Sequence, residues 1–170
     1  MEFAFGASWE VLKYDEPGGF YKTLLLKKVG ATKAVDFLCL RDADPLLLVE
    51  VKDFSRGVPG KEKYDVLPVT VTRKVRDTIA GVVGGRHTAG PHGRPLFTHA
   101  LGKLSNPPRV VYFFEDLATP ARRSRERTDN KRDVLLKKLK GHLRWLTSDI
   151  MVVGLDNYRL FIRDLTVRRV

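Results

Sequence analysis

The amino-acid sequence predicts a mixed α/β protein. Two observations support this fold class. Segments rich in β-branched and aromatic residues, at 33–41, 46–52 and 109–114, alternate with segments whose apolar residues recur at helical spacing. Residues 46–49 are uniformly apolar, as in a central strand that is covered on both faces. At 170 residues the chain has the size of one ordinary domain, so we expect a single domain over 1–170.

The individual elements follow from local patterns. Residues 33–41 and 46–52 are expected to pair as an antiparallel hairpin, because Asp42 and Pro45 break the run between them. Gly84-Gly85 is expected to end the helix that follows. The predicted order is a strand or helix end at 9–14, strands at 33–41 and 46–52, a loop at 53–68, helices at 71–83 and 97–104, a strand at 109–114, a helix from 128 or 129 to about 147, and strands at 150–153 and 158–162.

The charge indicates a polyanionic partner. Lys and Arg number 31 against 20 Asp and Glu, a net charge of +11 with a sequence pI near 9.9. Residues 122–144 hold ten basic and three acidic residues, a net charge of +7. The alternative is a solvated helix face, and an acidic membrane surface is disfavoured because no large apolar face accompanies the charge. The candidate nucleic-acid contacts in this segment are Arg122, Arg123, Arg125, Arg127, Lys137, Lys140 and Arg144.

Other features exclude whole classes of protein. The single cysteine, Cys39, excludes an intramolecular disulfide framework and fits a reducing compartment. The first residues show no basic region followed by a long apolar run, and no stretch approaches the roughly 20 apolar residues that span a bilayer. We therefore expect a cytoplasmic protein without a membrane partner.

Two charged residues end the apolar strand at 46–52. Glu50 and Lys52 are two positions apart, so the two-residue period of a strand places them on one face. Charged side chains seldom finish a buried strand unless they are paired or hold a metal. Asp36 joins them if the hairpin brings it opposite Glu50 or Lys52, because a slip of one residue would turn it to the other face. The structural alternative for the three residues is an inter-strand salt bridge.

Two carboxylates beside a lysine suit a metal-dependent hydrolytic site. Asp36 and Glu50 would repel each other in a partly desolvated site, which favours binding of a divalent cation. Mg²⁺ is the expected ion, with Mn²⁺ as a substitute, because it prefers oxygen ligands and keeps several waters. The backbone carbonyl of Val51 is a further candidate ligand. Lys52 would keep its charge beside two carboxylates, which favours orienting the attacking water over acting as a general base.

Asp36, thirteen intervening residues and then Glu50-Val51-Lys52 resemble the D…(D/E)xK signature of the PD-(D/E)xK, or restriction-endonuclease-like, nuclease superfamily. The motif covers residues 33–53, and the order of hairpin, long helix, strand and helix extends the resemblance to most of the chain. One departure is that Val35, and not proline, precedes Asp36. The resemblance implies a central mixed sheet flanked by helices in αβββαβ order.

The resemblance also suggests further site residues. A helix before the hairpin often contributes another acidic ligand in this superfamily, and Glu10 is the candidate here, with Asp15 and Glu16 behind it. Many relatives carry a polar or basic residue on the helix after the motif, which implies phosphate contacts from Arg73 or Lys74. The alternative for Arg73 is an exposed ion pair with Asp77 at i, i+4.

The predicted function is therefore that of a Mg²⁺-dependent DNA phosphodiesterase, with Asp36 and Glu50 as metal ligands and Lys52 positioning the nucleophile. The size of the chain leaves little room for a specificity domain or a motor. We expect a homodimer or the nuclease subunit of a larger DNA repair or anti-foreign-DNA defence system. The alternatives are a catalytically silent nucleic-acid-binding module that keeps the nuclease fold, and an RNA-directed nuclease.

Overall fold

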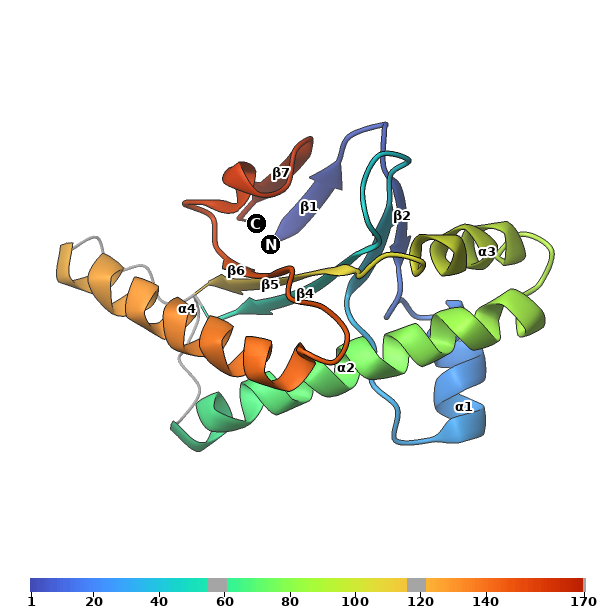
Figure 1. The fold of residues 1–170 in the computed structure, drawn as a ribbon, viewed down its shortest axis with the longest axis horizontal. Helices are drawn as coiled ribbons and strands as arrows, with labels where there is room; N and C mark the ends of the chain where they lie inside the picture. The colour runs from blue at the N-terminus through green and yellow to red at the C-terminus, as the bar shows by residue number, and fades with distance from the viewer. Residues whose placement is uncertain (55–60, 116–121, 170) are drawn as a thin grey trace.

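The fold is organised around one five-stranded mixed sheet (Figure 1). The computed structural model describes residues 1–54, 61–115 and 122–169, without the side chains at 24, 28, 61–64 and 122–128. The strands lie in chain order across the sheet: β2 (Glu10–Lys13), β3 (Phe37–Leu40), β4 (Leu47–Asp53), β5 (Arg109–Glu115) and β6 (Ile150–Val153). The pairs β2–β3 and β3–β4 are antiparallel, whereas β4–β5 and β5–β6 are parallel. The predicted α/β class and mixed sheet are confirmed.

The sheet is covered on both faces, which explains its apolar central strands. In β4, Leu48 faces a core cluster shared with the helices, whereas Leu47 and Val49 face a second cluster on the other side. Helices pack on the first face, and a two-stranded antiparallel ribbon lies over the second (Figure 1). The helices are α2 (Lys61–Thr88), α3 (Arg94–Lys103) and α4 (Arg122–Leu143), and the ribbon consists of β1 (Glu2–Phe5) and β7 (Leu165–Arg168).

The order of elements differs from the expected αβββαβ. The helical segment formed by η1 (Tyr21–Leu25) and α1 (Leu26–Val29) lies between the first two strands of the sheet, not before them. The predicted strand at 158–162 is wrong, because Tyr158–Leu160 forms a 3₁₀ turn. Its Tyr158 ring is buried and its hydroxyl accepts the Val167 N–H, so the turn supports the last strand instead of being one.

The long helix α2 extends well beyond its predicted bounds. It begins at Lys61 inside the predicted loop, accommodates Pro68 and continues through Gly84-Gly85 to Thr88. Gly85 does not end the helix but lets α3 pack closely, since a Cβ there would lie 2.7 Å from the ring of Phe97. Phe97 is itself buried, so it has little room to move. Helix α4 also differs, starting earlier and ending earlier than predicted, and Leu135, Leu139 and Leu143 form its buried face.

The neighbouring glycines of α2 give a matched pair of substitutions. Gly85→Ala is expected to destabilise the protein by about 1–3 kcal/mol, because the new methyl group overpacks the contact with Phe97. Gly84→Ala has nothing within 4 Å of the new Cβ, so the higher helix propensity of alanine should stabilise by about 0.5–1 kcal/mol. Urea denaturation of both variants measures the two signs, and equal effects would contradict the packing of α3 on Gly85.

Candidate active site

The hairpin register brings Asp36 opposite Glu50. Phe37 pairs with Val49 and Leu38 with Leu48, so the residue before β3 stands across from Glu50. One Asp36 carboxylate oxygen, Oδ2, accepts the Val51 N–H at 2.6 Å. The strand itself begins at Phe37 and not at residue 33, which leaves Asp36 at the mouth of the hairpin with 28% of its side chain exposed.

Glu50 is the buried member of the cluster. Its side chain is 1% exposed, on the helix-covered face of β4. Its Oε2 accepts a hydrogen bond from Lys74 Nζ at 2.8 Å. Its Oε1 lies 3.1 Å from Lys52 Nζ, close enough for an ion pair but not aligned as a hydrogen bond. Lys52 is one-third exposed, so it forms the solvent side of the cluster.

Lys74 enters the cluster from α2. Its ammonium lies 2.8 Å from Glu50 Oε2 and 3.7 Å from Asp36 Oδ1. The next turn of the helix holds the chain that leads into Asp36: Asp77 accepts the Lys33 N–H and Thr78 accepts the Val35 N–H. Three side chains at i, i+3 and i+4 thus fix α2 against the start of the hairpin.

Burial dominates the electrostatics of Glu50. Desolvation, with the nearby charge of Asp36, raises the pKa of Glu50 to about 7, although Lys74 and Lys52 oppose the rise. Burial lowers the pKa of Lys74, but the pairing with Glu50 and the charges of Asp36 and Asp15 outweigh it, so that pKa is raised overall. The cluster therefore holds a firmly protonated lysine beside a carboxylate that is costly to ionise.

This costly ionisation predicts a pH dependence of stability. The unfolded state has the ordinary Glu pKa of 4.5 and the folded state a pKa of about 7. Because the unfolded state loses the proton first, the contribution of Glu50 to stability is complete below pH 4.5 and falls as the pH rises to 7. Between about pH 5 and pH 8, the free energy of unfolding should fall by about 2–3 kcal/mol more in wild type than in Glu50→Gln. Urea denaturation of the metal-free proteins measures this, and identical pH dependences would contradict it.

The donor atoms fit a small divalent cation. Glu50 Oε1 is buried and accepts no hydrogen bond from any described residue, so it has coordinating capacity left. In a β-strand the N–H and C=O of one residue point to the same side of the strand. The Val51 carbonyl therefore points to the side on which the Val51 N–H donates to Asp36. Among the described residues, no three His, Cys, Asp or Glu side chains gather closely enough to hold a metal. An ion here would rely on two carboxylates, a carbonyl and water or substrate, as Mg²⁺ commonly does.

Other predicted residues lie elsewhere. Glu10 begins β2, away from the Asp36 end of that strand, and its carboxylate lies 3.2 Å from His99 of α3. It is not brought to the cluster, because residues 10–13 form a strand and not a helix. Arg73 is exposed on α2, and Asp77 pairs with Arg76 instead.

The predicted basic segment divides into parts with different roles. Lys137, Lys140 and Arg144 are exposed, whereas the side chains of Arg122, Arg123, Arg125 and Arg127 lie outside the described residues. Arg132, in the middle of the segment, is buried and cannot contact a ligand without leaving its partners.

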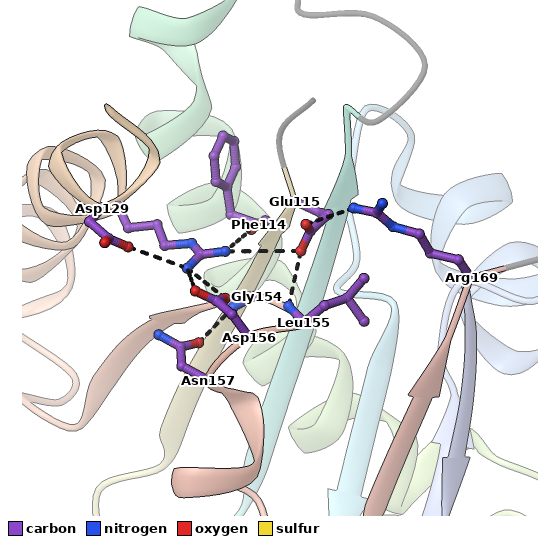
Figure 2. A network of polar contacts seen from close by, with 9 residues as sticks. Phe114, Glu115, Asp129, Gly154, Leu155, Asp156, Asn157 and Arg169 are labelled. Atoms are coloured by element: carbon purple, nitrogen blue, oxygen red, sulfur yellow. Dashed lines mark hydrogen bonds and ion pairs between the residues drawn. The ribbon is translucent and has the colours of Figure 1, made fainter. Parts of the chain in front are cut away.

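The partners of Arg132 form a polar network at the ends of β5 and β6 (Figure 2). Its guanidinium donates to both carboxylate oxygens of Asp156, at 2.8 and 2.9 Å, and lies 3.9 Å from Glu115. Glu115 also accepts from the Leu155 N–H and from Arg169. The network joins α4 to the sheet and to the last residues of the chain, and sequence reasoning assigned Arg132 no such role.

Two pockets differ in their relation to the cluster. One of about 270 Å³ opens beside Asp36 and is lined by Lys13, Asp15, Glu16, Pro17, Asp36 and Phe37. A larger one, of about 410 Å³, lies at the other end of β4 between Trp9, Arg41 and Phe161. The guanidinium of Arg41 there is already paired with Asp44 and Asp164. We place the candidate site at the smaller pocket because, of these two, it is the one that Asp36 lines.

Comparisons with protein-family models, with curated proteins and with solved structures find no match for this chain. Within the described part of the chain, none of the helices has the length and apolar character needed to cross a membrane. The assignment of function therefore rests on the geometry of the cluster and on the sequence motif.

Proposed function

We propose that this protein is a Mg²⁺-dependent DNA phosphodiesterase with a restriction-endonuclease-like core. The observation that carries the proposal is the meeting of Asp36, Glu50 and Lys52 on one face at the end of a central strand. The burial of Glu50, with its raised pKa, also supports the proposal. A buried carboxylate that is costly to ionise contributes little to stability, and such groups are common at functional sites.

The arrangement of strands supports the same proposal. The meander β2–β3–β4, followed by α2, α3 and β5 parallel to β4, resembles the βββαβ part of the superfamily core, with α3 as an additional helix before β5. The position of α1, between β2 and β3, departs from that core. Because α1 ends before β3 begins, it does not interrupt the β3–β4 hairpin that holds the three charged residues.

Each residue has a distinct part in the proposed reaction. Asp36, Glu50 and the Val51 carbonyl would hold Mg²⁺, which supplies positive charge at the scissile phosphate and acidifies water. Lys52, on the solvent side, would position the attacking water and neutralise charge on the phosphate oxygens. The water oxygen forms a bond to phosphorus and the bond from phosphorus to the leaving oxygen breaks. One proton from the water passes to solvent, and the leaving oxygen takes up a proton from solvent to become a hydroxyl group.

The charge of the chain suits a nucleic-acid substrate. Lys137, Lys140 and Arg144 are exposed on or just after α4, and phosphate contacts from such residues position a strand without selecting its sequence. We propose DNA as the substrate, and a homodimer or a larger repair or defence complex as the working assembly. This setting rests on the resemblance of the motif.

Cleavage assays test the proposed function directly. The purified protein should cut plasmid or linear DNA in Mg²⁺ or Mn²⁺ and be inactive in EDTA, with weaker action on RNA of the same sequence. Cleavage of RNA alone would redirect the assignment to an RNA nuclease. Tight DNA binding with no cleavage in either metal would establish the silent module and overturn the proposal.

A further inference from the structure

The ammonium of Lys74 lies between the two carboxylates that the proposed function assigns to Mg²⁺. We propose that the Lys74 ammonium takes the position of the metal ion in the metal-free protein, and that an incoming divalent ion displaces it. This inference rests on the proposed function, because it takes Asp36 and Glu50 as the metal ligands.

The contacts of Lys74 are those of a substitute for a metal ion. Its Nζ lies 2.8 Å from Glu50 Oε2 and 3.7 Å from Asp36 Oδ1, and its side chain is only 13% exposed. A lysine that served only to attract substrate phosphate would gain most from an exposed ammonium, as Lys52 has. Lys74 instead balances the charges of Glu50 and Asp36, and the pKa of Glu50 is raised first by burial and then by the nearby charge of Asp36.

The ammonium and a divalent ion cannot share this position. Mg²⁺ binds carboxylate oxygens at about 2.0–2.1 Å, so an ion shared by Glu50 Oε2 and Asp36 would collide with the ammonium that lies 2.8 Å from Oε2 and 3.7 Å from Asp36 Oδ1. Like charges at such a separation repel strongly in a site shielded from water. Asp36, Glu50, Lys52 and Lys74 together are neutral when all are ionised, and a divalent ion would add two positive charges. Retreat of Lys74 relieves the closest repulsion.

The structure offers a place for the displaced ammonium. The pocket of about 270 Å³ beside Asp36 has Asp15 and Glu16 in its wall. Asp15 pairs with Lys22 at 2.7 Å, so the displaced ammonium would share Asp15 with Lys22 or turn to Glu16. Asp15 is near enough for its charge to raise the pKa of Lys74 in the metal-free protein. A side chain with four rotatable methylene groups can move its ammonium from Asp36 toward Asp15 without a change in the helix.

The reactivity of the Lys74 amine toward a small labelling reagent tests this directly. The metal-free protein and the protein with saturating Mg²⁺, at matched ionic strength, are treated briefly with an acetylating reagent, and labelling at each lysine is read by mass spectrometry. We expect Mg²⁺ to raise the labelling rate of Lys74 at least about threefold, because it breaks the pair with Glu50. Lys140, exposed on α4, is the internal reference and should not change.

Glu50→Gln separates failure of this inference from failure of the proposed function. In this variant Lys74 should be labelled rapidly with or without Mg²⁺, and calorimetry should show the loss of metal binding. Metal binding that depends on Glu50, with unchanged labelling of Lys74 in wild type, would overturn the inference and leave the metal site intact. Equal metal binding by wild type and Glu50→Gln would overturn both.

Discussion

Glu50→Gln is expected to reduce the rate of metal-dependent DNA cleavage by at least about 10³-fold. Glutamine keeps the size of the side chain but removes the charge that would hold Mg²⁺ beside Asp36. The loss should lie in the chemical step and not in folding, because the amide replaces a carboxylate whose ionisation is costly at this position. Single-turnover cleavage of a linear duplex measures the rate, and the far-UV circular dichroism spectrum reports the fold.

Two further variants sharpen this expectation. Lys52→Ala should reduce the rate by about 10²–10³-fold, since it removes the positive charge that would neutralise the phosphate in the proposed reaction. Glu10→Gln is the matched control: the same chemical change is made at an exposed carboxylate paired with His99, and the rate should stay within about twofold. Cleavage that survives both Glu50→Gln and Lys52→Ala would remove this cluster from the reaction.

Arg132→Met is expected to destabilise the protein by about 2–3 kcal/mol. The change leaves Glu115, which is buried, without one of its neighbouring positive charges, and it separates α4 from Asp156. The cost falls below that of a fully buried pair because more than half of the Asp156 side chain is exposed. Lys137→Met, at an exposed position of the same helix, should change stability by less than about 0.5 kcal/mol.

Gly154 gives an independent test of the same network. A Cβ at this position would lie 1.8 Å from Arg132 Nη2, so Gly154→Ala must push the guanidinium away from its partners. The single variant should cost about 1–3 kcal/mol, whereas the same change in the Arg132→Met protein should be almost neutral. Thermal and urea denaturation of the four proteins completes the cycle. Additive effects would show that Gly154 matters for a reason other than Arg132.

The hairpin was predictable because its signals are local. The uniformly apolar run at 46–49 and the two-residue spacing of Glu50 and Lys52 identify a central strand and a shared face without any knowledge of the fold. The position of Asp36 depended on the turn, since a register slip of one residue would have placed its side chain on the other face of the sheet. In the structure, Glu50 is the residue that lies opposite Asp36.

Other features depend on contacts between distant segments. Lys74 was a candidate phosphate contact by sequence, and its pairing with Glu50 and Asp36 became visible only once α2 was placed against the mouth of the hairpin. Gly84-Gly85 has the sequence of a helix end, but the packing of Phe97 on Gly85 keeps the helix continuous. Arg132 belongs to a basic run that suggests a ligand, yet Asp156 and Glu115 reach it from the ends of β6 and β5. Local propensity carries no information about such partners.

The central claim is that Asp36 and Glu50 form a metal site, and crystals soaked in Mn²⁺ test it most directly. Anomalous scattering should place one ion between the two carboxylates, within bonding distance of the Val51 carbonyl, with the Lys74 ammonium moved toward Asp15. An unchanged Lys74–Glu50 contact, with no anomalous peak at this position in saturating Mn²⁺, would contradict the account.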